Sequence, residues 1–163
     1  MTSLKLTLAA VALFGLTACD SAGSMGGFGK NGGIMQSSLD PAGVAYFNQE
    51  IGDTVVFLVD QSSLTPVATD LLNKQAEWLL NNPNKSVIIE GHADETGTRE
   101  YNLALGARRA ASVQNYLVSR GLTDARISTV TFGKERPLAI CSDEACWSKN
   151  RRSVTLVAGG LGS

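Results

Sequence analysis

The sequence is poor in histidine, and this scarcity excludes several kinds of chemistry. His92 is the single histidine of 163 residues, and the acids beside it, Asp94 and Glu95, have no recognised metal-ligand spacing. Most nucleophilic mechanisms also need a base, and a single histidine leaves no spare one for them. Because Asp94 and Glu95 are adjacent, they do not form the separated acid pair of a glycosidase. We therefore predict no metal, no cofactor and no catalytic residue, and interpret His92 as a hydrogen-bonding residue.

The chain also lacks an excess of charge of one sign. Its 14 Lys and Arg residues and 15 Asp and Glu residues give a formal net charge of -1, and they are interspersed along the domain. A protein that binds nucleic acid needs a basic face, so we predict no nucleic-acid partner. The length suffices for one domain and is too short for two cores of ordinary size.

No apolar run is long enough to cross a bilayer, but a shorter one lies near the amino terminus. Lys5 precedes an apolar stretch over residues 6–16, and small residues follow before Cys19. This is the pattern of a secretory signal peptide, which we assign to residues 1–18. The sequence Leu16-Thr17-Ala18-Cys19 resembles a bacterial lipobox, so Cys19 is the predicted lipidation site and membrane anchor.

A glycine-rich segment follows Cys19. Such a composition cannot support a core and behaves as a flexible linker. We assign residues 19–42 to the lipidated amino terminus and its tether, and residues 43–163 to one folded domain. The glycines of the tether are Gly23, Gly26, Gly27, Gly29, Gly32 and Gly33.

The domain alternates strand and helix signals. Residues 55–59 read as a strand, and Thr65-Pro66 opens a helix with a cap and a proline in its first turn. Residues 87–89 follow the breaker Asn82-Pro83-Asn84 and fit a strand enclosed on both faces. Strands are also predicted over 127–132 and 153–158. The pattern predicts an α/β (α+β) two-layer sandwich, a mixed sheet with helices mainly on one face.

Two amphipathic helices complete this pattern. The second begins after Thr98, its predicted N-cap, and is ended by Gly121. We expect its inward stripe to be apolar. The predicted buried residues are Ala68, Leu71, Leu72, Ala76 and Leu79 in the first helix, and Leu103, Ala107, Ala110, Val113 and Leu117 in the second.

Charged and amide side chains surround the turn between the second strand and the second helix. The strand delivers Asp94 to the turn, while Asn102 and Arg109, seven residues apart, fall within roughly 20° of the same helix side. An aspartate accepts from an ammonium and an arginine donates to a carboxylate, so the pair suits a zwitterion. Asp94 could alternatively satisfy N–H groups of its own turn. Arg108 points roughly 100° from Arg109 and is expected at the solvated surface.

This region resembles the OmpA-like peptidoglycan-binding domain family. The resemblance extends over residues 54–156. Its motifs are Gly91-His92-Ala93-Asp94-Glu95, Tyr101-Asn102-Leu103, Arg108-Arg109-Ala110, Gly133-Lys134-Glu135-Arg136-Pro137 and Asn150-Arg151-Arg152.

The resemblance implies that the domain binds diaminopimelate in the stem peptide of peptidoglycan. Asp94 would take the ammonium and Arg109 the carboxylate, with Asn102 lining the pocket and Asp60, at the end of the first strand, at its rim. The roles of Arg151 and Arg152 stay open between bracing the fold, contacting the glycan and touching the peptide.

The resemblance further implies a noncatalytic lipoprotein on the periplasmic face of the outer membrane, which anchors that membrane to the wall. Its implied partners are TolB and the other Tol proteins, which act in envelope integrity and cell division. Asp20 follows the lipidated position and leaves inner-membrane retention as an alternative. Less favoured alternatives are a cell-wall hydrolase and a motor-anchoring or porin-attached relative.

The remaining cysteines lie in the segment before the last strand. Cys141 and Cys146 enclose four residues and, in an oxidising periplasm, are predicted to form a disulfide. Zinc is disfavoured because the chain offers no second ligand pair. We expect Trp78 to pack against the sheet, whereas packing and sugar stacking are equally plausible for Trp147.

Overall fold

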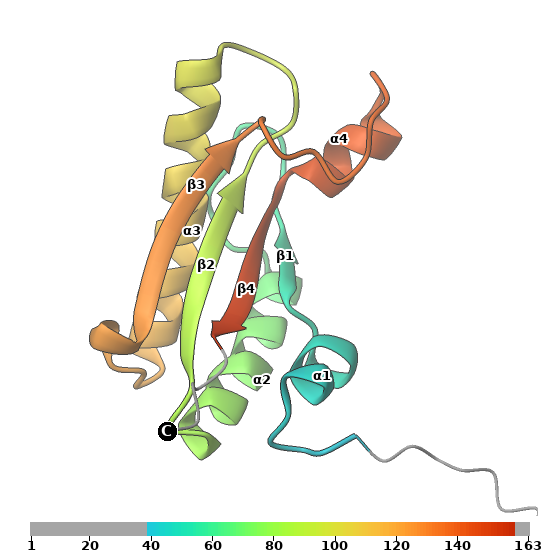
Figure 1. Ribbon diagram of the computed structural model, residues 1–163. Helices are drawn as coiled ribbons and strands as arrows, with labels where there is room; N and C mark the ends of the chain where they lie inside the picture. Colours follow the sequence, from blue (N-terminus) through green and yellow to red (C-terminus); the bar gives the residue numbers. More distant parts are fainter. Residues whose placement is uncertain (1–38, 159–163) are drawn as a thin grey trace, which may run out of the picture. The chain divides into compact units, whose positions relative to one another are not determined.

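The computed structural model describes residues 39–158, in which two long helices cover one face of a four-stranded sheet (Figure 1). The predicted signal peptide, the lipidation site Cys19 and the tether up to residue 38 lie outside the described residues. In chain order the elements are α1 Val44–Tyr46, the π-helical turn η1 Phe47–Ile51, β1 Thr54–Val56, α2 Pro66–Asn81, β2 Ser86–His92, α3 Arg99–Ser119, the 3₁₀ turn η2 Asp124–Arg126, β3 Ile127–Gly133, α4 Glu144–Asn150 and β4 Arg152–Ala158.

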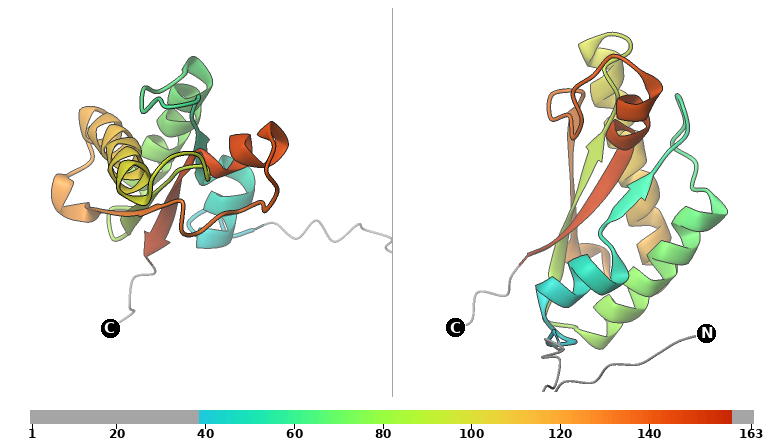
Figure 2. Two further views of the ribbon diagram at one scale, coloured as in Figure 1. Left: turned by 90° about the horizontal axis from the view of Figure 1, so that it is seen from above. Right: turned by 90° about the vertical axis from the view of Figure 1, so that its right-hand side faces the viewer.

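The sheet is mixed, with strand order β1-β4-β2-β3. Strand β2 pairs in parallel with β3 and antiparallel with β4, and β4 pairs antiparallel with β1. The views in Figure 2 show α2 and α3 together on one side of the sheet. The predicted fold class is therefore confirmed. Among residues 39–158, no helix has the length and apolar character needed to cross a bilayer.

Helix α2 forms as its sequence predicts. Pro66 stands at its first turn, and the Thr65 hydroxyl accepts a hydrogen bond from the Ala68 N–H at 3.2 Å. Of its predicted face, Leu71 is only half-buried while the other four residues are buried in the core. The core residues it meets include Val55, Val87, Ile89, Val113 and Leu117.

Helix α3 is capped as expected but presents a different face. Thr98 accepts from the Tyr101 N–H at 3.2 Å, and Gly121 follows the helix with a φ of 104°. The predicted apolar stripe is confirmed for Ala110, Val113 and Leu117 and is wrong for the other two residues. Leu103 is half-buried and Ala107 exposed, while the buried residues are Asn102, Leu105, Gly106, Arg109, Ala110, Val113 and Leu117.

A glycine pair explains how α3 is turned. A Cβ at Gly91 would lie 1.9 Å from the carbonyl oxygen of Gly106, so the backbones of β2 and α3 meet with no side chain between them. This approach faces Asn102 and Arg109 toward the end of the sheet where β2 finishes. The spacing of apolar residues along α3 does not predict this contact, because neither glycine has a side chain.

Two strand predictions also need correction. Strand β2 is not enclosed on both faces, because Val87 and Ile89 are buried while Ile88 between them is 40% exposed. The first strand ends at Val56, so residues 57–59 are not strand, and they lead into the turn that holds Asp60. Short elements that the pattern did not predict are α1, η1, η2 and α4.

Candidate functional site

Asp94 lies in the turn between β2 and α3 and is 7% exposed. Its Oδ1 accepts hydrogen bonds from the Thr96 N–H at 3.1 Å and from the Thr96 hydroxyl. Its Oδ2 accepts from the Arg151 Nη1 at 3.3 Å. The carboxylate therefore does two things at once: it stabilises its own turn, as the alternative interpretation anticipated, and it forms a buried ion pair.

Arg109 is fully buried and joins α3 to two other segments. Its Nε donates to the Gln61 carbonyl at 2.9 Å, its Nη1 to the His92 carbonyl at 2.8 Å and its Nη2 to the Leu58 carbonyl at 3.1 Å. Burial lowers the pKa of Arg109 to about 10, against the opposing effect of the Asp94 charge. The guanidinium thus fixes the loop before α2 against the end of β2.

Asn102 and Asp60 complete the predicted set. Asn102 is buried, and its amide donates to the Thr96 carbonyl at 2.7 Å, so Thr96 links it to Asp94. Asp60 is exposed with a φ of 54°, and it accepts from the Tyr101 hydroxyl at 3.4 Å. Arg109 donates to the carbonyls of Leu58 and Gln61, which lie on either side of Asp60 in the chain. The four predicted residues therefore converge on one end of the sheet, with Asp60 outermost.

Arg151 belongs to this site, although the sequence left its role open. It is 4% exposed, and its Nη1 lies 3.3 Å from Asp94 and 3.2 Å from the Glu144 Oε2. Its Nη2 bonds the other Glu144 oxygen, and its Nε donates to the Phe57 carbonyl at 3.3 Å. These bonds raise the pKa of Arg151 and lower that of Glu144, with the hydrogen bond between the two as the main cause. The Arg108 guanidinium, by contrast, is exposed as expected and lies 6.0 Å from the Tyr101 ring.

The His92 side chain lies on the face of the sheet that α2 and α3 do not cover. Its Nε2 is 3.3 Å from the Glu90 carboxylate, and its Nδ1 has no hydrogen-bond partner within residues 39–158. Burial, followed by the charge of Arg152, lowers its pKa below 6.5. Arg152 is itself buried and donates to the Arg136 carbonyl at 3.2 Å. His92 acts as a hydrogen-bonding residue, and Arg152 braces the loop after β3.

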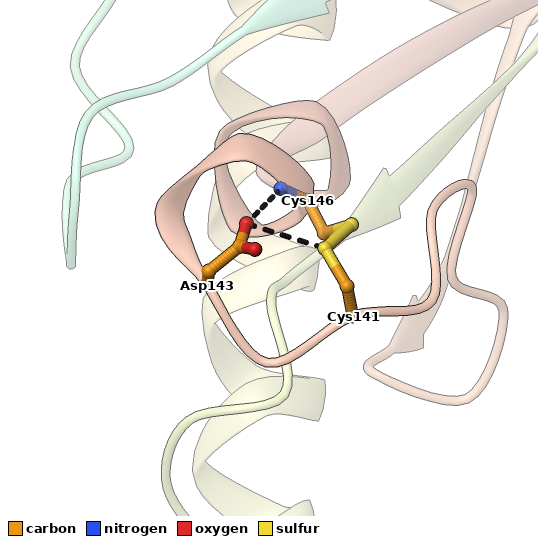
Figure 3. A group of neighbouring side chains, drawn as sticks. All are labelled: Cys141, Asp143 and Cys146. Atoms are coloured by element: carbon orange, nitrogen blue, oxygen red, sulfur yellow. Dashed lines mark hydrogen bonds between the residues drawn. A yellow bond between two sulfur atoms is a disulfide. The ribbon is translucent and has the colours of Figure 1, made fainter.

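The predicted cysteine pair lies at the start of α4. Cys141 and Cys146 are joined by a disulfide with their Cα atoms 5.6 Å apart (Figure 3). Together with Asp143 they bring potential ligand atoms within 4.8 Å, but both sulfur atoms are used by the disulfide. A cysteine binds a metal ion as its thiolate, so the disulfide leaves Asp143 as the one ligand of this group, and the cluster does not fit a metal.

The tryptophans differ in their surroundings. Trp78 is buried in the core, as a packing role predicts, but its aromatic partner is Phe47 of η1 and not a strand residue: the ring centroids are 4.9 Å apart. Its indole N–H donates to the Pro41 carbonyl at 2.7 Å. Trp147 of α4 is half-buried, and its indole N–H donates to the Glu95 carboxylate at 3.1 Å. Helix α4 therefore contacts the turn that carries Asp94 at a second point.

A cavity of about 430 Å³ adjoins these residues, with Phe57 and Arg151 in the wall it shares with the site. A larger cavity of about 530 Å³ lies between η1 and α2 and includes none of the predicted residues. The predicted site residues and Arg151 therefore gather at the end of β2. Charged groups of both signs meet there, an arrangement that suits binding of a doubly charged ligand.

Comparison with known proteins agrees with this description. Residues 56–151 match the OmpA family. A peptidoglycan-associated lipoprotein of Rhizobium meliloti is 46% identical over 163 residues, which cover all of this chain and 89% of the relative. One of Agrobacterium fabrum is 48% identical over 122 residues, covering 75% of this chain and 69% of the relative.

A solved structure gives the same result. The crystal structure of the peptidoglycan-associated lipoprotein from Burkholderia pseudomallei matches with a TM-score of 0.68 and 36% identity, covering 73% of this chain and 100% of that one. The family is not one of enzymes, which confirms the noncatalytic prediction. The chain belongs to the OmpA family and, within it, to the peptidoglycan-associated lipoproteins.

Proposed function

We propose that this chain is a noncatalytic outer-membrane lipoprotein that binds peptidoglycan and anchors the membrane to the wall. The names of its relatives support this function. The observation that carries it is the convergence of Asp94, Asn102 and Arg109 on the turn between β2 and α3. The stem peptides of a cell wall have charged ends, and we propose that such an end binds at this turn.

The proposed ligand is the free end of diaminopimelate in the stem peptide, which carries an ammonium and a carboxylate. Asp94 offers the acceptor for the ammonium, and the remaining N–H groups of the Arg109 guanidinium offer donors for the carboxylate. Asn102 holds the turn that carries Asp94, and Asp60 lies at the rim. Because Arg109 is buried, the carboxylate reaches it only when the segment around Leu58 and Gln61 shifts.

The rest of the chain fits delivery to the wall. In this proposal residues 1–18 are removed, Cys19 carries the acyl chains, residues 19–42 form the tether and residues 43–163 form the binding domain. The lipid rests in the periplasmic leaflet of the outer membrane, and TolB and the other Tol proteins are the partners. Density fractionation of membranes tests the location, and Cys19→Ala releases the chain from both membranes if Cys19 is the anchor.

The wall-binding site is tested by Asp94→Ala in a pull-down with purified sacculi. A charge-assisted contact is worth roughly 1.5 to 3 kcal/mol, so binding weakens by about tenfold to a hundredfold. Asp70→Asn, an exposed aspartate on α2, is the matched control and binds as the unaltered chain does. Full retention of the Asp94→Ala protein, with its circular dichroism unchanged, would reject the site.

A change in the ligand tests the other charge. Amidation of the free diaminopimelate carboxylate removes the anion that Arg109 would meet, and it leaves the ammonium intact. We expect lower affinity for amidated than for unmodified stem peptide. Equal affinity for the two would show that the carboxylate is not recognised.

A further inference from the structure

Arg151 is the cation that already neutralises Asp94. Within residues 39–158, the ion pairs of Asp94 comprise this single contact at 3.3 Å, and the two side chains are 5% and 9% exposed. A ligand ammonium that approaches Asp94 meets a carboxylate already bonded to a guanidinium. Its affinity therefore depends on how firmly Arg151 holds Asp94.

Glu144 competes for the same guanidinium. It bonds both terminal nitrogens of Arg151, whereas Asp94 takes only one of them. Without Glu144, both terminal nitrogens of Arg151 are available to Asp94, because a guanidinium prefers a bidentate carboxylate. The contacts that then oppose this turn are the Phe57 carbonyl on the Arg151 Nε and Thr96 on the Asp94 Oδ1. The 64% exposure of the Glu144 side chain leaves the negative charge facing solvent, where it also favours an approaching cation.

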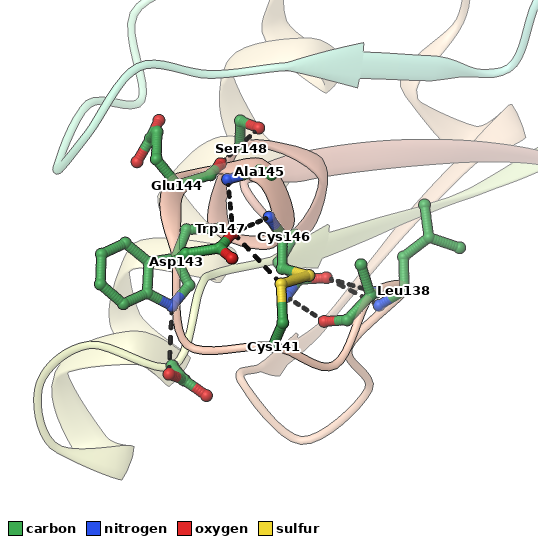
Figure 4. Close-up of a disulfide and its surroundings, with 11 residues drawn as sticks. Leu138, Cys141, Asp143, Glu144, Ala145, Cys146, Trp147 and Ser148 are labelled. Atoms are coloured by element: carbon green, nitrogen blue, oxygen red, sulfur yellow. Dashed lines mark hydrogen bonds between the residues drawn. A yellow bond between two sulfur atoms is a disulfide. The ribbon is translucent and has the colours of Figure 1, made fainter.

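Helix α4 fixes the position of Glu144. A helix of seven residues does not persist alone, so its neighbours must hold it. Asp143 caps it by accepting from the Ala145 N–H at 2.8 Å and the Cys146 N–H at 3.3 Å, and the disulfide closes the same turn (Figure 4). At its other end, Asn150 accepts from the Leu138 N–H at 2.8 Å. Glu144 thus projects from a turn restrained on both sides.

We infer that Glu144, held by the disulfide-closed start of α4, is a positioning residue of the ligand site: it draws Arg151 away from Asp94 and so keeps that carboxylate open to the ligand ammonium. This inference rests on the proposed function. In this inference the disulfide affects binding by holding Glu144 in place. Glu144 in turn acts through Arg151 and does not need to touch the ligand.

The first test substitutes Glu144→Gln in the full-length chain, with free meso-diaminopimelate and purified sacculi as probes. The amide removes the competing charge and keeps the side-chain size. We expect binding to weaken about three- to tenfold with only a small fall in the melting temperature, because the Glu144 side chain is 64% exposed and an exposed ion pair contributes little to stability. Glu144→Asp keeps the carboxylate and recovers most of the affinity, which a purely structural role would not require. Glu77→Gln, an exposed residue of α2, is the control.

The second test replaces both cysteines, Cys141→Ser with Cys146→Ser. The loosened turn weakens binding in the same direction, and adding Glu144→Gln to that protein changes little, because the two act through one pathway. Independent, multiplicative losses would overturn the link between disulfide and Glu144.

Asp94→Ala separates the two proposals. If it abolishes binding while Glu144→Gln binds as the unaltered chain does, the site stands and the positioning role of Glu144 is wrong. If Asp94→Ala itself binds normally, the proposed function fails and the inference fails with it.

Discussion

Arg109, the proposed partner of the ligand carboxylate, also stabilises the fold. Its guanidinium is fully buried and donates to three backbone carbonyls, of which that of His92 is buried and those of Gln61 and Leu58 are partly buried. We expect Arg109→Leu to leave the His92 carbonyl without a donor, at a cost of ~1–3 kcal/mol, and the two partly buried carbonyls to cost less because water reaches them. Urea denaturation measures the loss, and Arg108→Leu, at the neighbouring exposed position, changes the midpoint little. A normal midpoint for Arg109→Leu would mean that the carbonyls find other donors.

The single histidine predicts how stability depends on pH. The folded pKa of His92 lies below 6.5, so the unfolded chain binds more protons between the two pKa values. The free energy of unfolding therefore rises with pH through this window and falls as the pH drops below about 6.5. The groups facing the ring are Glu90 on its own strand, Phe132 on β3, Arg136 in the loop after β3 and Arg152 at the start of β4.

Replacement of this residue checks the dependence. Urea titrations of His92→Gln at a series of pH values between about 7 and 5 give a flatter profile than those of the unaltered chain, because the glutamine does not titrate. The shared carboxylates of the two proteins cancel in the comparison. Identical slopes would assign the acid sensitivity to the carboxylates alone.

At the scale of elements, the contact between β2 and α3 decides whether the site forms. A methyl group at Gly91 would overlap the Gly106 carbonyl oxygen, which is backbone and cannot swing aside. We expect Gly91→Ala to push α3 from the sheet, lowering the melting temperature by many degrees and abolishing wall binding together. Thermal unfolding followed by circular dichroism measures this. A Gly91→Ala protein of unchanged stability would contradict the close approach.

The same contact explains what the sequence could and could not predict. The N-caps Thr65 and Thr98 are local signals, and both helices begin where these residues indicate. The buried face of α3 depends instead on a partner fifteen positions away in the chain, and apolar periodicity does not register a glycine that touches another glycine. Helix α4 is too short for a periodic signal.

The site residues also fall into two groups: those that local sequence predicts, and those that depend on contacts between distant segments. Asp94, Asn102 and Arg109 follow from one strand-turn-helix run, so spacing alone places them on one side of the turn. Arg151 contacts Asp94 across 57 residues of sequence, and Glu144 is linked to Asp94 through Arg151. Such contacts depend on the order of strands in the sheet, which local patterns do not encode.

For the whole molecule, thiol chemistry gives a direct measurement. The chain has three cysteines, and Cys141 and Cys146 are paired in the structure. With Cys19→Ala, we expect the native secreted protein to expose no reactive thiol before reduction and two after it. Titration with a thiol reagent under native and reducing conditions measures both. Two reactive thiols before reduction would refute the bridge.

The ends of the sheet bear on how the molecule would carry force. The described chain enters beside α1 at one end, where Trp78 holds the Pro41 carbonyl, and the turn with Asp94 lies at the other end, where β2 finishes (Figure 1). Tension between a membrane and a wall would therefore run lengthwise along the strands. Such a force would shear β2 against β4. The hydrogen bonds between these two strands would then resist it together and would not break one after another.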